Sequence, residues 1–249
     1  MIIAIDGVSG AGKSSLAKEV AKELDFGFFS AGYFYRAITY EALKRNILDN
    51  QDDLLHILMN NLDIKLMYDE NKSLVMFVNG ENITNHLHTE EISCNVAKYS
   101  LKPYIREKVR VLQRETKNYN SGIVMEGRDI GSEIFPDAEI KVYVTCSAEI
   151  RAKRRVKDYE KLGEFVDAKK VEQELVERDF RDMHREISPL KKCDDAIVID
   201  TSNKSVLECA KIVVDKALSI EEQKKREEKQ EEKNILSHYE NKCAKMAFR

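Results

Sequence analysis

Residues Ile2–Leu24 read IIAIDGVSGAGKSSLAKEVAKEL, and this stretch decides the fold. Its first part, Ile2–Ile5, is a short apolar run that is typical of a buried β-strand. A glycine-rich turn follows at Gly7–Gly12, and apolar residues then recur every four positions up to Leu24, which is helical spacing. A strand, a tight turn and a helix in this order predict the start of an α/β domain.

The turn carries the motif G-x-x-x-x-G-K-[ST] from Gly7 to Ser14. Glycines let backbone N–H groups turn inward around phosphates, and the helix that follows directs the positive end of its dipole at them. Lys13 would add a positive charge at the β- and γ-phosphates, and the Ser14 hydroxyl would be a ligand of Mg²⁺. We therefore predict an ATP site. Its expected residues in this segment are Gly7, Val8, Ser9, Gly10, Ala11, Gly12, Lys13, Ser14 and Ser15.

The phosphate-binding motif alone is common to GTPases, to motor and transport ATPases, and to small-molecule kinases. A GTPase would need a base-reading N-K-x-D sequence, and the nearest candidate, Asn203–Val206, lacks the aspartate. We also find no apolar strand that ends in Asp–Glu, as in many ATPases. The chain has 249 residues, a length that fits a small-molecule kinase best.

Composition indicates where the protein works and what it binds. The formal net charge is −3, so an anion must bind through local clusters of Arg and Lys, and we expect neither a nucleic-acid nor a membrane partner. The five cysteines form no CxxC pair and show no Cys–His spacing typical of zinc, which predicts reduced thiols. No signal peptide is recognisable, and no segment approaches the ~18 apolar residues of a membrane span. We expect a cytoplasmic protein.

Strand-like and helical segments alternate along most of the chain. This alternation predicts a parallel, doubly wound sheet flanked by helices. The strand-like runs are Phe28–Phe29, Ile123–Met125, Lys141–Thr145 and Ala196–Ile199, and the helical patterns are Tyr33–Leu43, Ile92–Lys117 and Val206–Leu218.

One region between these elements has a different pattern. Ile64–Tyr68 and Leu74–Val78 are strand-like runs separated by the polar turn Asp69–Ser73, and the turn signal Asn79–Gly80 precedes a third run, Glu81–Thr84. This pattern predicts a small antiparallel sheet in a separate lobe. Further along, residues 149–190 are densely charged, which predicts a helical pair or a mobile lid, and the tail after residue 219 predicts a charged helix.

Arginines gather after predicted strands and on one predicted helix. Arg36 and Arg128 each follow a strand, and ligands of open α/β sheets bind at the carboxyl ends of the strands. Arg178, Arg181 and Arg185 share one helical face. A charge run by itself is more often a solvated surface, but a phosphate acceptor beside an ATP site needs arginine clamps. We therefore predict a second anion site beside the first.

With these segments, the sequence resembles the bacterial cytidylate kinase family over about residues 1–219. The matching stretches after the first helix are GYFYRAI (32–38), VMEGRDIGSEIFPDAEIKVYV (124–144), SAEIRAKRR (147–155) and VERDFRDMHREISPL (176–190). The resemblance implies the nucleoside monophosphate kinase fold, transfer of the γ-phosphoryl group of ATP to CMP or dCMP with Mg²⁺, and a monomer. It also implies a core (1–57, 122–148 and 191–219), an acceptor-binding insert (58–121), a lid (149–190) and an extension (220–249).

The resemblance assigns a role to each matching polar residue. Arg106 and Asp129 would read the cytosine ring. Arg36, Arg128 and Arg185 would hold the acceptor phosphate. Tyr35, Arg178 and Asp182 would contact the ribose. Arg181 and an arginine of the 151–155 cluster, Arg151 or Arg155, would close over the ATP phosphates. The expected catalytic cations are Lys13, Arg128, Arg181 and Arg185.

Two positions depart from the family pattern. The family usually carries Asp-Ser-Gly before its Tyr-Arg pair, whereas this chain has Ser30, Ala31 and Gly32. A second usual serine, nine residues before the arginine equivalent to Arg106, aligns with Ala97. The first change removes a sugar contact and the second a base contact, which Ser30 or Ser100 would have to supply. An unpaired buried polar group costs ~1–3 kcal/mol, so we expect weaker selectivity against UMP.

The chemistry needs no catalytic histidine. The acceptor phosphate has a second pKa near 6 and is largely dianionic at neutral pH, so its oxygen is already a nucleophile. We expect catalysis by positioning and charge neutralisation, with His184 as the histidine nearest the site. Two alternatives stay open: a kinase for another acceptor such as UMP, AMP or shikimate, and a non-catalytic ATP-binding or scaffold protein.

Overall fold

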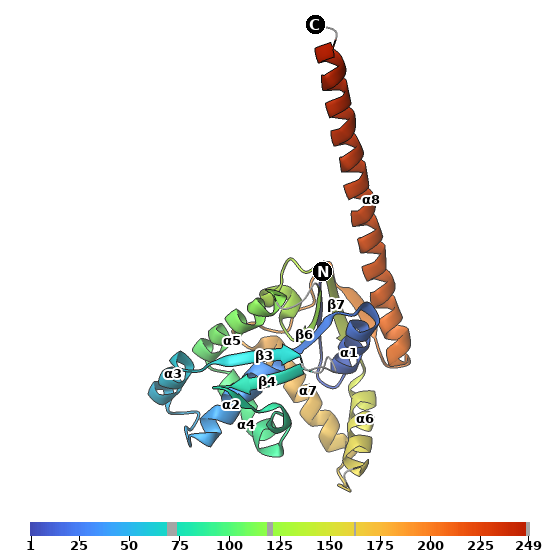
Figure 1. Cartoon of the computed structure of the whole chain (residues 1–249). Helices are drawn as coiled ribbons and strands as arrows, with labels where there is room; N and C mark the ends of the chain where they lie inside the picture. Colours follow the sequence, from blue (N-terminus) through green and yellow to red (C-terminus); the bar gives the residue numbers. More distant parts are fainter. Residues whose placement is uncertain (69–73, 119–121, 162, 248–249) are drawn as a thin grey trace.

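The computed structural model describes residues 1–68, 74–118, 122–161 and 163–247, and its centre is a five-stranded sheet (Figure 1). The strands follow the order β2-β6-β1-β7-β8, and each pairs in parallel with its neighbours. The predicted parallel sheet is thus confirmed. Its strands are β1 Ile2–Gly7, β2 Gly27–Ser30, β6 Ile123–Gly127, β7 Ile140–Thr145 and β8 Ile197–Asp200.

Register brings the carboxyl ends of the central strands together. Asp6 of β1 pairs with Gly127 of β6, and Gly7 pairs with Val144 of β7. On the outer side of β6, Ser30 of β2 pairs with Glu126. The polar residues that end or follow these strands therefore share one edge of the sheet, which is where ligands of such sheets bind.

Alternation along β1 distributes its side chains between two cores. Ile3 and Ile5 are fully buried on the face that α1 (Lys13–Leu24) and α8 (Val206–Ala247) cover. Ala4 is buried on the opposite face, against α2 (Gly32–Lys44) and α5 (Pro103–Glu115). Helices on both faces make the sheet doubly wound, as the alternation of elements predicts.

The predicted helix Ile92–Lys117 is wrong in one respect, because two helices occupy this segment. Helix α4 spans Glu90–Ser100, and α5 begins at Pro103. Proline lacks a backbone N–H and excludes helical geometry from the residue before it, yet it fits well at the first position of a new helix. The break turns the chain, and α4 and α5 therefore present separate faces to the site.

The antiparallel lobe is confirmed. Strands β3 (Ile64–Tyr68), β4 (Leu74–Val78) and β5 (Glu81–Asn82) form a three-stranded sheet, and the predicted turn Asp69–Ser73 lies outside the described residues. A helix that the periodicity did not predict, α3 (Asp52–Asn60), precedes it. The predicted boundary between residues 57 and 58 falls inside this helix, and the division into core, insert and lid stays a prediction.

The charged segment after β7 forms two helices. Helices α6 (Ala148–Lys161) and α7 (Ala168–His184) pack together through the buried side chains of Ala152, Val171 and Leu175. These two helices are the helical pair predicted for residues 149–190. Their packing brings the arginine-bearing face of α7 beside the phosphate-binding loop.

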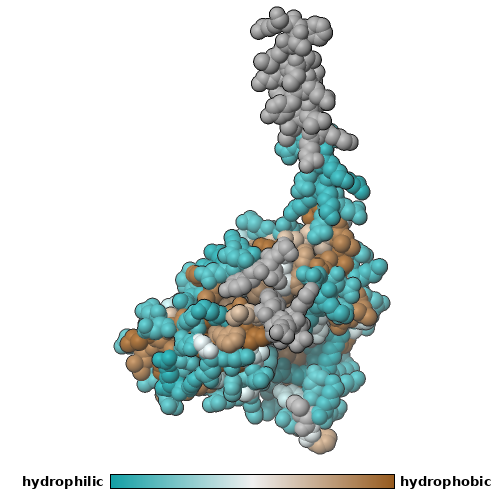
Figure 2. All heavy atoms as spheres, viewed as in Figure 1, coloured by the Kyte–Doolittle hydropathy of each residue, from teal (hydrophilic) through white to brown (hydrophobic). Residues whose placement is uncertain are grey.

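The tail continues α8 as one helix that projects from the domain (Figure 1). Val213 and Ala217 are fully buried against the sheet, and beyond them Lys224 Nζ lies 3.0 Å from Glu139 Oε1. Figure 2 shows hydrophilic side chains around the segment of α8 that lies between the domain and the grey atoms. Across the described residues, no helix is both long and apolar enough to cross a membrane.

Candidate active site

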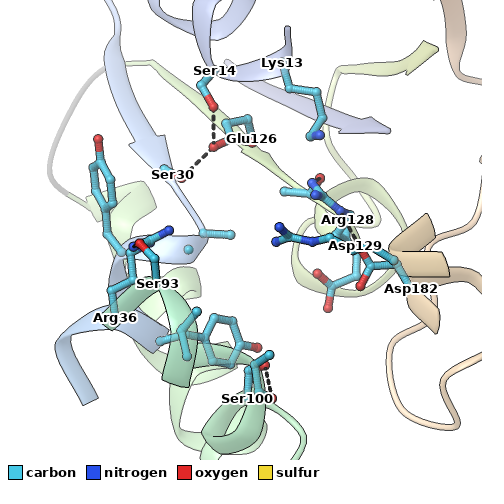
Figure 3. A pocket seen from close by; sticks show the side chains of 18 of the residues that line it. Lys13, Ser14, Ser30, Arg36, Ser93, Ser100, Glu126, Arg128, Asp129 and Asp182 are labelled. Atoms are coloured by element: carbon cyan, nitrogen blue, oxygen red, sulfur yellow. Dashed lines mark hydrogen bonds and ion pairs between the residues drawn. The ribbon is translucent and has the colours of Figure 1, made fainter. Parts of the chain in front are cut away.

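A cavity of about 730 Å³ lies at the carboxyl ends of β1, β2 and β6 (Figure 3). The phosphate-binding loop forms one end, and α2, α4, α5 and α7 surround the other. The structure brings most of the predicted site residues to its wall. They are Gly10, Gly12, Lys13, Ser14, Ser15, Tyr35, Arg36, Arg106, Arg128, Asp129, Arg178, Arg181, Asp182 and Arg185.

Glycine is required where the loop leaves β1. Gly7 has φ +149°, and a Cβ at this position would lie 2.0 Å from the carbonyl oxygen of Val144. Gly12 has φ +87° and immediately precedes the first turn of α1. These two positions bring the loop against β7 and aim the start of α1 at the cavity, where the helix dipole favours an anion.

Lys13 is held beneath the loop. It is only 4% exposed, and its Nζ donates a hydrogen bond of 2.7 Å to the carbonyl oxygen of Val8. Burial, assisted by the nearby positive charge of Arg128, lowers the pKa of Lys13 to about 7. A phosphate oxygen beside Lys13 would favour the ammonium form and raise this pKa again. The lysine is therefore placed to respond to the charge of a bound phosphate.

Glu126, at the end of β6, is a site residue that sequence analysis missed. Its Oε1 accepts hydrogen bonds from Ser14 Oγ at 3.0 Å and from Ser30 Oγ at 2.5 Å, as Figure 3 shows. Many ATPases carry an Asp–Glu pair at the end of an apolar strand, whereas this chain places the single carboxylate of Glu126 there. Because the Ser14 hydroxyl donates its hydrogen bond to Glu126, its oxygen lone pairs are available to a cation.

This donor set fits magnesium. The described residues contain no group of three or more His, Cys, Asp or Glu side chains that could hold a metal ion. Mg²⁺ prefers oxygen ligands, keeps several of its waters, and is usually held by one or two carboxylates together with substrate phosphates. Ser14 and Glu126 provide one hydroxyl and one buried carboxylate of this kind.

Asp6 fixes the loop that follows β6. Its two carboxylate oxygens accept hydrogen bonds from the backbone N–H groups of Ile130, at 2.9 Å, and Gly131, at 2.8 Å. Burial raises the pKa of Asp6 to about 6, although both hydrogen bonds oppose this shift. The loop then holds Arg128, whose Nε donates to Asp182 Oδ2 at 2.9 Å.

At the far end of the cavity, the half-buried Arg36 and the buried Arg106 contact polar partners. Arg36 Nη1 donates to the carbonyl oxygen of Leu87 at 2.8 Å and to Ser93 Oγ at 2.9 Å. Arg106, 6% exposed, stacks its guanidinium 5.5 Å from the centre of the Tyr35 ring. The end of the cavity thus offers several donors in fixed positions.

Two oppositely charged residues, Arg185 and Asp129, lie next to each other at this end of the cavity. Arg185 Nη2 lies 3.7 Å from Asp129 Oδ1, too far for a hydrogen bond, and this buried nitrogen has no hydrogen-bond partner in the described part of the chain. Burial raises the pKa of Asp129, while the neighbouring Arg185 and Arg106 lower it. An unpaired guanidinium N–H beside the cavity is suited to a phosphate oxygen.

Comparison with known proteins identifies the relatives of this chain. The family model "Cytidylate kinase" matches residues 3–223. Proteins named cytidylate kinase from Geobacillus sp. (strain WCH70), Bacillus subtilis (strain 168) and Streptococcus sanguinis (strain SK36) are 41%, 40% and 38% identical to it. These matches cover 88%, 90% and 88% of this chain and 95%, 97% and 96% of theirs. This chain belongs to the cytidylate kinase family.

Several residues predicted to bind ATP, from the phosphate-binding motif or from the family resemblance, do not line the cavity. Gly7, Val8, Ser9 and Ala11 form the buried back of the loop. Arg151 is 5% exposed, and its guanidinium donates to the carbonyl oxygen of Ser9 at 2.7 Å and to Asp179 Oδ2 at 2.6 Å. Since Asp179 also accepts from the Ser9 N–H at 2.8 Å, Arg151 ties the loop to α7.

Arg155 also lies outside the cavity wall. It is exposed on α6, with its guanidinium 5.7 Å from the centre of the Tyr159 ring. For both Arg151 and Arg155, contact with ATP phosphates stays a prediction. Among the histidines in the described residues, His88 lines the cavity and His184 does not, so the expectation that His184 lies nearest is wrong. His184 is instead stacked on Phe180 on the outer side of α7.

The two family departures both lie in the cavity wall, at Ala31 and Ala97. The Ser30 hydroxyl donates a hydrogen bond to Glu126, and this bond lies on the side toward Ser14 (Figure 3). Ser100 lines the cavity one turn beyond Ala97 and donates to the Ala97 carbonyl oxygen at 3.0 Å. Of the two serines that could replace the missing hydroxyls, Ser100 is the one that lies at the end of the cavity away from the phosphate-binding loop, which we call the acceptor end.

Proposed function

We propose that this protein is a cytidylate kinase that transfers the γ-phosphoryl group of MgATP to CMP and dCMP, with CDP and dCDP as products. The observation that carries the proposal is the shared cavity. A phosphate-binding loop with Lys13 forms one end, and Arg36, Arg128 and Arg185 lie toward the other. Membership of the cytidylate kinase family supports the choice of acceptor.

The positive side chains of the cavity would offset the repulsion between the two bound substrates. Two polyanions must approach in line, and their repulsion opposes the reaction. Lys13 and the loop N–H groups would neutralise the donor phosphates, while Arg36, Arg128 and Arg185 would hold the acceptor phosphate as a dianion. A phosphate monoester is largely dianionic at neutral pH, so the acceptor oxygen attacks without a general base. Arg181, also in the cavity wall, would stabilise charge on the transferred group.

Magnesium would sit between the donor phosphates and the end of β6. When bound, Mg²⁺ neutralises charge on the transferring phosphates and orients them. Ser14 would present an oxygen lone pair to it, and Glu126 would hold this hydroxyl in place and add a negative charge beside the cation.

The nucleoside would occupy the end of the cavity formed by α2, α4 and α5. Arg106 and Asp129 would read the cytosine ring, and Tyr35, Arg178 and Asp182 would contact the ribose. The α6–α7 pair would act as a lid that excludes water from the transferring group, which would otherwise hydrolyse ATP. We further propose that the protein acts as a cytoplasmic monomer, with ATP and CMP or dCMP as its small-molecule partners.

Product identification tests the proposal directly. The purified full chain is incubated with MgATP and CMP, and the phosphorus NMR spectrum is followed with time. We expect equal amounts of ADP and CDP, with slow release of inorganic phosphate when CMP is omitted. ATP hydrolysis that is unaffected by CMP, with no CDP, would overturn the proposal.

A further inference from the structure

Four residues of helix α4 line the cavity, namely Ser93, Val96, Ala97 and Ser100, and three of them follow one another at helical spacing. These three are Ser93, Ala97 and Ser100, so they form one face of the helix. The middle position is the one where the family usually carries a serine. The flanking serines are therefore the hydroxyl groups of α4 that stand nearest to the missing one. Figure 3 shows Ser93 beside Arg36 and Ser100 hydrogen-bonded to the backbone of its own helix.

The two serines differ in what they can still bind. Ser93 Oγ accepts a hydrogen bond of 2.9 Å from Arg36 Nη1, so it serves the arginine assigned to the acceptor phosphate. Ser100 Oγ donates its proton to the Ala97 carbonyl oxygen at 3.0 Å. A hydroxyl has one proton and two lone pairs. Toward any further partner in the cavity, Ser100 can therefore act only as a hydrogen-bond acceptor.

Cytosine and uracil differ at the position where such a group would discriminate. Cytosine carries a 4-amino donor and an N3 acceptor, whereas uracil carries a 4-oxo acceptor and an N3–H donor. The neighbouring wall supplies donors from Arg106 and acceptor oxygens from Asp129, both of them buried. An acceptor beside position 4 favours the amino group and leaves a uracil oxygen facing another lone pair.

We propose that Ser100 is a specificity-determining residue, which accepts a hydrogen bond from the 4-amino group of the cytosine base in place of a hydroxyl at position 97. This inference deepens the proposed function and rests on it, because it places the base of the acceptor nucleotide at the α4 end of the cavity.

The test compares serine-to-alanine changes on the same helical face. Steady-state kcat/KM is measured for CMP and UMP with the full chain, with Ser100→Ala and with Ser93→Ala. Removing the acceptor at Ser100 should lower the CMP:UMP ratio of kcat/KM about tenfold, mainly through KM for CMP. Ser93→Ala is the matched control, since disturbing Arg36 should affect both acceptors equally and leave the ratio unchanged. Alanine favours a helix, so both variants should fold.

A rescue variant separates hydrogen bonding from packing. Ala97→Ser in the Ser100→Ala background restores a hydroxyl one turn away, and its own proton can be given to a preceding carbonyl of the helix. We expect the CMP:UMP ratio to return to within a few-fold of the original value. The assignment would be overturned if the CMP:UMP ratio of kcat/KM were unchanged in Ser100→Ala, or if this ratio fell equally in Ser93→Ala.

Calorimetric titration of CMP and UMP into the same proteins, without ATP, tests the base contact of Ser100 separately from the proposed kinase activity. Preferential CMP binding that depends on Ser100, in a protein that makes no CDP, would keep the base contact and overturn the kinase assignment. CDP formation with equal binding of CMP and UMP by the unaltered chain would keep the kinase and overturn the role of Ser100.

Discussion

The two ends of the cavity are built in different ways. The phosphate-binding end comes from one contiguous segment that uses backbone N–H groups, Lys13 and Ser14. The acceptor end is assembled by side chains from α2, α4, α5, the loop after β6, and α7. A triphosphate has the same shape in every reaction, so a fixed backbone loop can bind it. A base has to be distinguished from others, and individual side chains such as Ala97 can change without loss of the fold.

The largest expected effect is at the phosphate-binding end. Lys13→Ala removes a buried cation from the donor phosphates and should lower kcat by about 1,000-fold, the upper range for one preorganised group. Lys22→Ala, at an exposed lysine of the same helix, is the matched control and should retain activity. Comparable kcat values for the two variants, measured by ADP release, would mean that the loop does not work through Lys13.

At the acceptor end, removing one arginine should lower kcat somewhat less than removing Lys13 does. Arg185→Ala removes the guanidinium whose Nη2 lies 3.7 Å from Asp129, and kcat should fall at least about 100-fold because the acceptor phosphate loses a clamp. Arg185→Lys keeps the charge without the planar fork and should recover part of the loss. Circular dichroism establishes that the fold persists. Near-normal turnover in Arg185→Ala would contradict the assignment.

Glu126 belongs to the phosphate-binding end, where it accepts hydrogen bonds from both Ser14 and Ser30. Glu126→Gln keeps the size of the side chain and removes its charge, so the apparent affinity for Mg²⁺ should fall about tenfold. The affinity is measured by titrating Mg²⁺ into protein with ADP and following heat or intrinsic fluorescence. Glu115→Gln, at an exposed residue of α5, is the control. Equal Mg²⁺ affinities would remove Glu126 from the metal site.

The smallest effect concerns the loop that connects the ends. A carboxyl pKa raised from 3.8 to about 6 means that folded Asp6 holds its proton more tightly than the unfolded chain does. The folded protein therefore loses stability from Asp6 as the pH rises from about 4 to about 6, and the loss then levels off. Asp6→Asn cannot titrate, so its free energy of unfolding should fall less over this range. Parallel pH profiles from urea unfolding would contradict the raised pKa.

Much of this fold was predictable because its signals are local. The strand, turn and helix of residues 2–24 and the later apolar runs each report their own conformation. Pro103 also stood in the sequence, but a helical pattern on both sides of it hid the break between α4 and α5. The amphipathic α3 lies next to the inserted sheet, and only packing against α2 and α5 establishes it.

The site was predictable where the residue type itself carries the chemistry. Arg178, Arg181 and Arg185 all line the cavity, although α7 ends at His184 and Arg185 follows it with an extended backbone instead of continuing the predicted helical face. Glu126 was missed because a single carboxylate at a strand end has no distinctive pattern, and its role depends on β2 and α1 lying beside it. The direction of Arg151 could not be predicted either, since it depends on α6 and α7 meeting behind the loop at Asp179.

The most direct measurement of the central claim is kcat/KM of the purified chain with MgATP and each of CMP, dCMP, UMP and AMP. The account predicts efficient turnover of CMP and dCMP, UMP weaker by about tenfold or more, and AMP weaker still. Equal turnover of UMP and CMP would contradict base recognition at the α4 end of the cavity, and turnover of none of the four would contradict the kinase assignment itself.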